Sequence, residues 1–195
     1  MDYLIYNIKS LTEKEYTKWF SLMTEEKQEK VSKYKDFDRK RASVAGEMLV
    51  KEHIGKALNI KPDNLIIVTD KNGKPYIESC SVHFNISHCE DFLLCAFSDK
   101  EIGADIEKIK PFSLSVLKSF FSEEEQKYVL GKPLNEAASD DYNAPEILER
   151  FYRIYTLKEA ICKKSGIGIK GLRDADALPL LDKSFKENNF IISII

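Results

Sequence analysis

The sequence predicts an α+β fold, in which antiparallel strands are flanked by helices. Two short apolar runs, residues 82–86 and 92–97, follow one another closely enough to form neighbouring strands. Two longer segments predict helices: residues 38–58 lack proline and are apolar on more than one side, and residues 146–164 end at Gly166. This mixture of antiparallel strands and long helices in a chain of 195 residues is typical of the α+β class.

Local signals predict the remaining elements of the first hundred residues. Residues 3–8 alternate enough to form an edge strand. Thr24, which two glutamates follow, is typical of a helix N-cap with acidic residues in the first turn. Residues 65–68 predict a short strand, and Asn72-Gly73 predicts the turn after it.

A second group of elements begins after a tight turn at residues 98–100. A strand around Asp105 follows this turn, and we expect it to run antiparallel to the strand before it. Residues 113–121 predict a helix, and residues 122–125 have the spacing of a capping box that begins another. Residues 131–146 are rich in Pro, Asn, Ser, Ala and Asp, which predicts an exposed loop. We detect no internal sequence repeat.

The composition argues against several classes of protein. A net charge of −2 gives no reason to expect nucleic-acid binding. No apolar run approaches the ~20 residues of a membrane span, and the N-terminus has no basic signal region, so we expect a cytoplasmic protein without a membrane segment. Four cysteines without a CxxC pair and only three histidines argue against a zinc site and predict free thiols. We expect a monomer.

Charge is unevenly distributed, although the total is near zero. Residues 27–41 contain seven basic side chains against three acidic ones, a local excess of four positive charges. Two interpretations of this segment remain open. It is either a solvated helix face or a site for an anionic ligand or an acidic partner.

Asp105 and Glu107 lie two residues apart inside an apolar run. On a strand this spacing points both carboxylates to the same face, where two anions repel each other unless a cation or a proton lies between them. Charges on a strand edge that discourage aggregation are the alternative interpretation. The apolar neighbours Ile102, Ala104 and Ile106 favour a functional site.

A predicted helix supplies a third carboxylate, Glu159, and four residues later an ammonium group, Lys163. The two side chains share one helix face, so an ordinary i,i+4 ion pair worth ~0.3–0.5 kcal/mol is the alternative interpretation. Together with Asp105 and Glu107 they provide three hard oxygen donors and one cation. This donor set favours Mg²⁺ that holds a polyphosphate substrate.

Four motifs in order resemble those of the 4′-phosphopantetheinyl transferases, most closely the surfactin-synthetase-activating (Sfp-type) branch. The motifs are Phe84-Asn85-Ile86-Ser87-His88, Ile102-Gly103-Ala104-Asp105-Ile106-Glu107, Lys158-Glu159-Ala160 and Lys163. Their order and spacing agree over roughly residues 3–172. Tyr155 occupies the usual Trp position of the family's WxxKEA motif, and the chain ends at Ile195, earlier than the family usually does.

The resemblance implies two similar α+β halves with a pseudo-twofold relationship, residues 1–101 and 102–195, with the active site between them. The early end at Ile195 leaves two interpretations open, an abbreviated second half or a truncated or degenerate member. It implies transfer of 4′-phosphopantetheine from coenzyme A to a serine of an acyl or peptidyl carrier protein, with release of 3′,5′-ADP. Carriers of fatty acid biosynthesis and of nonribosomal peptide or polyketide biosynthesis are equal alternatives. A non-catalytic relative that binds coenzyme A or a carrier protein remains an alternative, as does an unrelated phosphate-handling Mg²⁺ protein.

The resemblance also assigns roles to individual residues. Asp105, Glu107 and Glu159 would hold Mg²⁺, and with Lys163 they form the predicted catalytic set. Contacts with coenzyme A are assigned to seven residues: Lys27, Lys30, Arg41, Lys74, Ser87, His88 and Lys163.

Three assignments keep two interpretations each. Arg41 lies about one residue out of the family's register, so Arg39 is the alternative contact for coenzyme A. Glu159, directly or through a metal-bound water, is the predicted general base, a role that competes with metal binding. Glu125 closes a capping box with Ser122, although the family often has a glutamate at this position.

Overall fold

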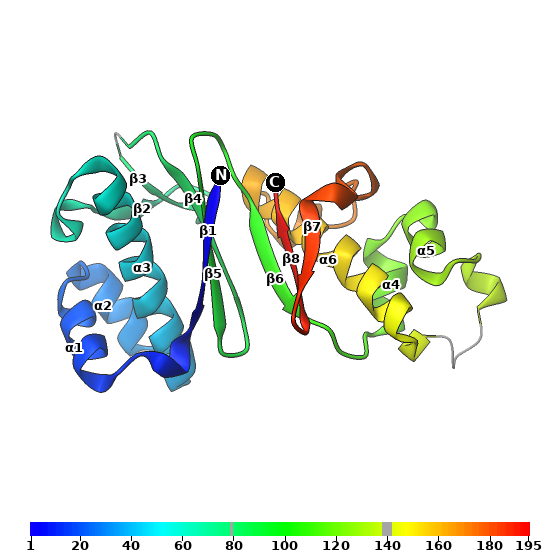
Figure 1. Cartoon of the computed structure of the whole chain (residues 1–195), viewed down its shortest axis with the longest axis horizontal. Coiled ribbons are helices and arrows are strands. Elements are labelled where there is room, and N and C mark those ends of the chain that lie inside the picture. Colours follow the sequence, from blue (N-terminus) through cyan, green and yellow to red (C-terminus); the bar gives the residue numbers. More distant parts are fainter. Residues whose placement is uncertain (79, 138–141) are drawn as a thin grey trace. The chain divides into compact units, whose positions relative to one another are not determined.

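The computed structural model describes residues 1–78, 80–137 and 142–195 of the chain (Figure 1). The chain divides into two compact units, Met1–Glu101 (unit 1) and Ile102–Ile195 (unit 2). Each unit combines a three-stranded antiparallel sheet with helices. The α+β class predicted from the sequence is therefore confirmed.

The sheet of unit 1 has its last strand in the centre. Its order is β1-β5-β4, and both ladders are antiparallel. The strands of this sheet are β1 (Asp2–Asn7), β4 (His83–Cys89) and β5 (Phe92–Ser98). A separate antiparallel ladder joins β2 (Ile67–Thr69) to β3 (Pro75–Ile77). Gly73 has a φ of +86° in the turn between them, a conformation that glycine adopts without strain.

Helices follow β1 in the chain and cover the sheet of unit 1. They are α1 (Glu13–Ser21), α2 (Glu25–Ser32) and α3 (Phe37–Leu58), with the short 3₁₀ helices η1 (Ile8–Ser10) and η2 (Pro62–Asn64). The predicted N-cap is confirmed, because the Thr24 hydroxyl accepts a hydrogen bond from the backbone N–H of Lys27. No helix was expected at α1, although Thr12 and Glu15 form a capping box at its start.

The sheet of unit 2 has the order β6-β8-β7, again antiparallel and again with the last strand in the centre. The strands are β6 (Ala104–Lys108), β7 (Ser184–Glu187) and β8 (Phe190–Ile194). The prediction that the Asp105 strand pairs with its predecessor is wrong, because β6 pairs with β8. Both edges of β5 are already paired with β1 and β4, so β5 has no backbone groups left for another ladder.

The helices of unit 2 lie between β6 and β7 in the chain. They are α4 (Leu114–Phe120), α5 (Glu123–Leu130) and α6 (Pro145–Ser165), with the 3₁₀ helices η3 (Leu134–Glu136), η5 (Ile169–Gly171) and η6 (Leu178–Lys183). The predicted capping box is confirmed, because Ser122 and Glu125 each accept the other's backbone N–H. The predicted loop at residues 131–146 contains η3, and its residues 138–141 lie outside the described residues.

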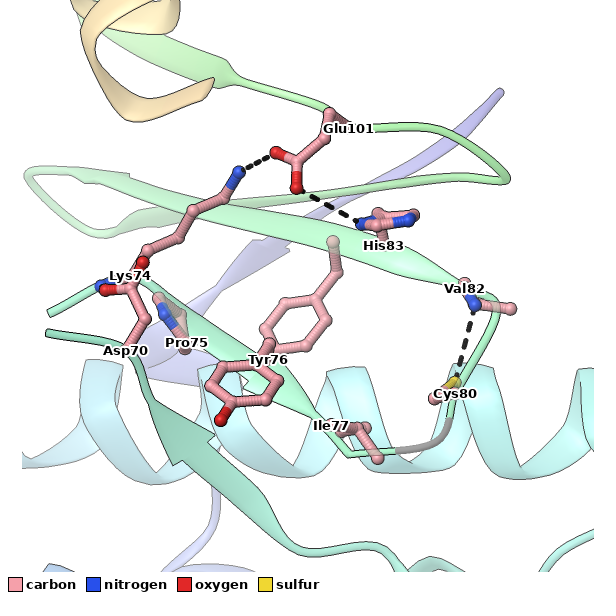
Figure 2. A pocket seen from close by; sticks show the side chains of 10 residues that line it. Asp70, Lys74, Pro75, Tyr76, Ile77, Cys80, Val82, His83 and Glu101 are labelled. Atoms are coloured by element: carbon pink, nitrogen blue, oxygen red, sulfur yellow. Dashed lines mark hydrogen bonds and ion pairs between the residues drawn. The ribbon is translucent and has the colours of Figure 1, made fainter. Parts of the chain in front are cut away.

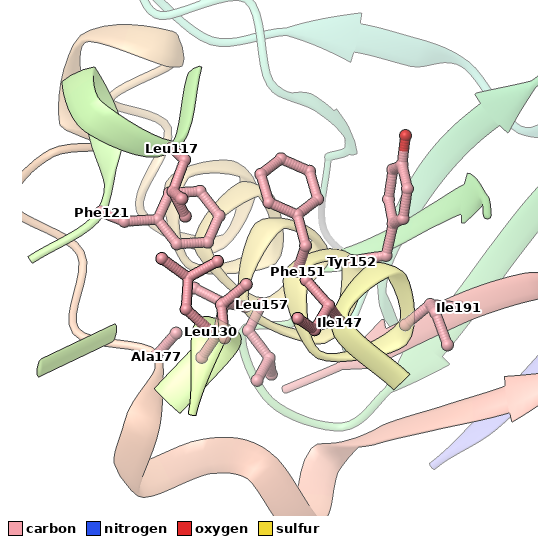
Figure 3. Close-up of a cluster of buried hydrophobic side chains, with 11 residues drawn as sticks. Leu117, Phe121, Leu130, Ile147, Phe151, Tyr152, Leu157, Ala177 and Ile191 are labelled. Carbon is pink, nitrogen blue, oxygen red and sulfur yellow. The ribbon is translucent and has the colours of Figure 1, made fainter. Parts of the chain in front are cut away.

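An aromatic cluster anchors α6 within unit 2 (Figure 3). The Phe151 ring stacks on Phe112 and Phe121, with centroid distances of 4.0 and 5.0 Å. Leu117 of α4 and Leu157 of α6 are fully buried in the same cluster. Because stacked rings and branched side chains fill the space between these helices, α6 is held firmly beside α4 and α5.

The two units share one order of elements, although we detect no repeat in the sequence. A strand, three helices and a final hairpin follow one another as β1-α1-α2-α3-β4-β5 in unit 1 and as β6-α4-α5-α6-β7-β8 in unit 2. Among its described residues, unit 2 contains no counterpart of the β2–β3 ladder of unit 1. Both units therefore share a three-stranded sheet and one long helix.

Candidate functional site

β6 presents two carboxylates on one face. Asp105 and Glu107 alternate with apolar residues along the strand, so their side chains point in the same direction. Asp105 is only 3 % exposed, and Glu107 is half-buried. A charge that decorates a strand edge is solvated, so the burial of Asp105 argues against that alternative.

Gly103 allows the start of β6 to approach α6 closely. A Cβ atom at this position would lie 2.0 Å from the carbonyl oxygen of Ala160 and 2.8 Å from the backbone nitrogen of Lys164. Both are backbone atoms, which cannot swing away as a flexible side chain can. The strand that carries Asp105 therefore packs this closely on the helix that carries Glu159 only because residue 103 has no side chain.

We expect Gly103→Ala to lower the free energy of unfolding by roughly 1–3 kcal/mol, because the added methyl group forces β6 away from α6. Gly46→Ala on α3 is the matched control. Its Cβ atom would lie 3.5 Å from Ile86, an ordinary contact, and alanine is the better helix former. Urea unfolding measures both variants, and Gly46→Ala should be neutral or stabilising. Equal stability of the two variants would contradict the close packing of β6 on α6.

Lys163 joins α6 to β6. Its Nζ lies 2.6 Å from Oδ1 of Asp105, and the two side chains are 29 % and 4 % exposed. An i,i+4 ion pair of Lys163 with Glu159 is the alternative interpretation of the sequence. The ion pair that the structure shows for Lys163 instead crosses from the helix to the strand.

Burial and nearby carboxylates raise the pKa values of two side chains on α6, Tyr155 and Glu159. Tyr155, Glu159 and Lys163 follow at four-residue spacing and so share one face of the helix. Burial and the charge of Asp105 raise the pKa of Glu159, whereas Lys163 and a hydrogen bond from Tyr155 lower it. Burial and the charges of Glu159, Glu107 and Asp105 raise the pKa of Tyr155. Negative charge is therefore concentrated between α6 and β6.

The chemistry of these donors fits a divalent cation. Hard carboxylate oxygens are the ligands that Mg²⁺ prefers, and a cation beside Glu159 would offset the repulsion that raises its pKa. Within residues 1–78, 80–137 and 142–195, no group of three His, Cys, Asp or Glu side chains lies close enough together to hold a metal ion. The carboxylates are thus gathered in one region, but they do not form a preassembled ligand cluster.

Lys27 in unit 1 lies at a cavity of about 190 Å³. The cavity is lined by Lys27, Ala42, Ser43, Gly46, Glu47, Ile67, Pro75 and Ile86. Burial lowers the pKa of Lys27, the Glu47 carboxylate raises it, and the charges of Lys30 and Lys51 lower it. A half-buried ammonium group beside the small side chains of Ser43 and Gly46 leaves room for an anionic group.

An ion pair that the sequence analysis missed lies next to this cavity on α3. Glu47 and Lys51 are 2.8 Å apart, and their side chains are only 5 % and 3 % exposed. Their i,i+4 spacing is visible in the sequence. However, the same spacing is common on exposed helix faces, so spacing alone does not indicate burial.

Lys74 lies at a second cavity, of about 300 Å³, that β3 and the start of β4 help to line. Its Nζ contacts Oε2 of Glu101 at 2.5 Å, and Oε1 of Glu101 lies 3.8 Å from Nδ1 of His83. Figure 2 shows Lys74 and His83 pointing toward Glu101. Pro75 of β3 lines both this cavity and the cavity at Lys27.

The other predicted contacts with coenzyme A do not gather at either cavity. Ser87 is buried and His88 is exposed, because consecutive residues of β4 point to opposite faces of the sheet. Arg39 and Arg41 each lie over an aromatic ring, 4.4 and 4.9 Å from its centroid. None of these four residues is among the lining residues of the two cavities.

Comparison with known proteins identifies the family. Residues 10–100 match the model of the 4′-phosphopantetheinyl transferase N-terminal family, and residues 101–192 match that of the 4′-phosphopantetheinyl transferase superfamily. The chain is 33 % identical over 168 residues to the 4′-phosphopantetheinyl transferase Sfp of Bacillus subtilis (strain 168), which covers 86 % of this chain and 70 % of that protein. The chain belongs to the 4′-phosphopantetheinyl transferase family.

Two further phosphopantetheinyl transferases are similar to this chain. A 4′-phosphopantetheinyl transferase of Bacillus subtilis is 30 % identical over 181 residues, which is 92 % of this chain and 76 % of that protein. The 4′-phosphopantetheinyl transferase gsp of Aneurinibacillus migulanus is 30 % identical over 149 residues, 76 % of this chain and 58 % of that protein. The family predicted from the motifs is confirmed, and so is the enzyme class, a phosphopantetheinyl transferase.

Proposed function

We propose that this phosphopantetheinyl transferase moves 4′-phosphopantetheine from coenzyme A to a serine of an acyl or peptidyl carrier protein, in a Mg²⁺-dependent reaction that releases 3′,5′-ADP. One observation carries the proposal. β6 carries Asp105 and Glu107, α6 carries Glu159 and Lys163, and the two elements are joined by Lys163 and the buried Asp105 at 2.6 Å. A pyrophosphate with concentrated negative charge needs such a combination of metal-binding oxygens and a cationic donor.

Asp105, Glu107 and Glu159 are the residues that would hold the metal ion. Bound there, Mg²⁺ supplies positive charge that neutralises the pyrophosphate and its leaving group. The burial of Asp105 supports this role, because a carboxylate that is shielded from water interacts more strongly with a cation.

Lys163 would donate hydrogen bonds to the phosphate oxygens, where negative charge grows during transfer. Its contact with Asp105 keeps the ammonium group between helix and strand before substrate binds. Acceptance of the proton of the attacking serine hydroxyl by Glu159 is the alternative to metal binding by the same carboxylate. The raised pKa of Glu159 without a bound cation supports the general-base role, because a general base works best when its pKa lies near the working pH.

Lys27 and Lys30 would bind the 3′-phosphate of coenzyme A. The support is the half-buried ammonium group of Lys27 at its cavity and the positive charge of Lys30 beside it. Lys74 would lie beside the adenosine part. Three further contacts stay predictions from the sequence: Ser87, His88 and Arg41.

Lys27→Glu combined with Lys30→Glu is expected to weaken coenzyme A binding by ~10-fold or more and dephospho-coenzyme A binding much less, because only coenzyme A carries the 3′-phosphate. Calorimetric titration of both ligands measures the difference. Lys35→Glu with Lys40→Glu changes the charge of the same basic segment equally and is the control. If the Lys27 and Lys30 variant lost both ligands equally, the two lysines would act only through overall charge.

Mass spectrometry of a carrier protein tests the proposed reaction directly. Incubation with coenzyme A and Mg²⁺ should add one phosphopantetheine to the carrier, and chelation of Mg²⁺ should prevent the gain. Coenzyme A binding without any mass gain would favour a non-catalytic relative. Failure to bind coenzyme A would favour an unrelated phosphate-handling protein. Carriers of a fatty acid synthase and of a peptide synthetase, tested side by side, reveal which class the enzyme prefers.

Two further expectations from the sequence concern the state and location of the protein. A monomer and a cytoplasmic location stay predictions, which size measurements and cell fractionation test. In the parts of the chain that the structure describes, no helix combines the length and the apolar character that crossing a bilayer requires.

A further inference from the structure

A fully buried ion pair joins α5 to α6. Lys158 and Glu125 are each 1 % exposed, and Nζ lies 2.8 Å from Oε2. Lys158 also donates hydrogen bonds to the backbone carbonyl oxygens of Leu172, at 3.1 Å, and Ala175. An ammonium group has three N–H donors, and three acceptors surround this one.

The carboxylate of Glu125 has backbone partners as well. Its Oε2 accepts the N–H of Ser122 at 2.8 Å, and its Oε1 accepts the N–H of Ala177 at 3.1 Å. The network therefore ties together the start of α5, the middle of α6 and residues 172–177. Fully satisfied buried networks of this kind hold their members in one arrangement, because every alternative leaves a charge without partners.

This network holds one side of α6 toward α5 and residues 172–177. Lys158 directly precedes Glu159, and successive residues of an α-helix point about 100° apart. With Lys158 held toward α5, Glu159 is directed to a different side of the helix. That side also carries Lys163, whose Nζ lies 2.6 Å from Oδ1 of Asp105 on β6. Gly103 sets how closely β6 approaches the same turn of α6, so the side of α6 that faces α5 and the distance to β6 depend on different contacts.

The long helix of unit 1 also contains a buried lysine in an ion pair. Lys51 on α3 is also buried and paired, and it lies eight residues before Asn59, the left-handed C-cap. Lys158 lies eight residues before Gly166, the left-handed C-cap of α6. The shared order of elements thus places a buried, paired lysine at the same point of each long helix. In α3 the carboxylate partner comes from the helix itself, whereas in α6 it comes from a neighbouring helix.

We propose that Glu125 and Lys158 are positioning residues, which set the location of Glu159 and Lys163 relative to the carboxylates of β6. The proposal rests on the proposed function of Glu159 and Lys163. It also assigns the buried Lys158 of the WxxKEA-like motif a task distinct from that of its neighbour. Glu125 acts through Lys158 and touches no reacting atom.

A cycle of Glu125→Gln, Lys158→Met and the double variant tests the pair. Each single variant leaves one group of the network without its partner, so the urea midpoint of unfolding should fall. The double variant removes both charges and should recover most of the lost stability, as replacement of a buried ion pair by neutral side chains often does. We expect kcat to fall by ~10-fold or more in Lys158→Met and to stay low in the double variant, because misplaced groups remain misplaced. KM for coenzyme A should rise as well, because Lys163, a predicted contact with coenzyme A, is displaced together with Glu159.

Hydrogen–deuterium exchange provides a readout that does not depend on activity. Amides of residues 155–164 should exchange faster in Lys158→Met and remain faster in the double variant, even where its urea midpoint is restored. Lys51→Met is the matched control in unit 1. It removes an equally buried lysine and should lower the urea midpoint without changing exchange within residues 155–164.

The proposal would be overturned if the double variant recovered kcat and slow amide exchange as well as stability. The ion pair would then only stabilise the fold. Unchanged exchange of residues 155–164 in Lys158→Met would overturn it as well. If the wild-type protein transferred no phosphopantetheine to any carrier, only the proposed function would be contradicted. The exchange comparison would then still decide whether the pair positions α6.

Discussion

Glu159→Gln is expected to stabilise the folded protein at neutral pH while it lowers kcat by ~10²-fold or more. Glutamine keeps the size and hydrogen bonding of the side chain but removes its charge and basicity. In the wild-type protein, burial and the charge of Asp105 raise the pKa of Glu159. The folded state therefore binds this proton more tightly than the unfolded chain does, and ionised Glu159 lowers the stability of the fold.

The stabilisation by Glu159→Gln should have a defined pH dependence. At pH 8 the wild-type protein carries the unfavourable charge and the variant does not, so the variant should unfold at higher urea concentration. As the pH falls through the raised pKa toward the ordinary value of 4.5, wild-type Glu159 gains its proton and the difference should shrink. Glu146→Gln, at the exposed start of α6, controls for the loss of a carboxylate from this helix. A destabilised Glu159→Gln variant with intact kcat would show that Glu159 is structural.

Asp105→Ala is expected to abolish Mg²⁺-dependent transfer, with kcat/KM lower by ~10²–10³-fold or more, because a buried metal-binding carboxylate is lost. Its effect on stability should be smaller than that of Lys163→Ala. Lys163 is 29 % exposed and can turn to water when Asp105 is absent, whereas the Asp105 side chain is only 4 % exposed and loses its ammonium partner at 2.6 Å when Lys163 is absent. We expect Lys163→Ala to lower the free energy of unfolding by roughly 1–3 kcal/mol.

Urea unfolding of the two single variants and the double variant measures this asymmetry. The double variant should be about as stable as Asp105→Ala alone, because no buried carboxylate remains to be neutralised. Calorimetric titration with Mg²⁺ in the presence of coenzyme A should detect no metal binding to Asp105→Ala. Wild-type turnover of Asp105→Ala would end the assignment of Asp105 as a metal ligand. Equal stability of the two single variants would argue against the burial of this carboxylate.

Features encoded within a few neighbouring residues were predicted well. The N-cap at Thr24 and the capping box of Ser122 with Glu125 depend on residues three positions apart, so the sequence contains both partners of each contact. The common direction of Asp105 and Glu107 follows from the two-residue period of a strand. One such signal was overlooked, since the capping box of α1 is equally local.

The choice of partners over long distances was not predictable in this way. The ladder between β6 and β8 joins Asp105 to Ser193, and the central place of β5 in its own sheet explains why the neighbouring strand was the wrong partner. The burial of Lys158 was also not predictable from the sequence. Its carboxylate partner is Glu125, which the sequence analysis had connected only with the capping box.

The sequence by itself determined the family and the α+β class, and it predicted the donor set of the candidate site, because motifs, caps and alternation are properties of short segments. Tertiary structure alone decided that Lys163 pairs with Asp105, that Lys158 is enclosed by α5 and residues 172–177, and that Gly103 must lack a side chain. These features depend on which segments meet after the chain has closed long loops. The packing of whole helices and strands decides which segments meet, and the sequence around each contact residue does not indicate its partner.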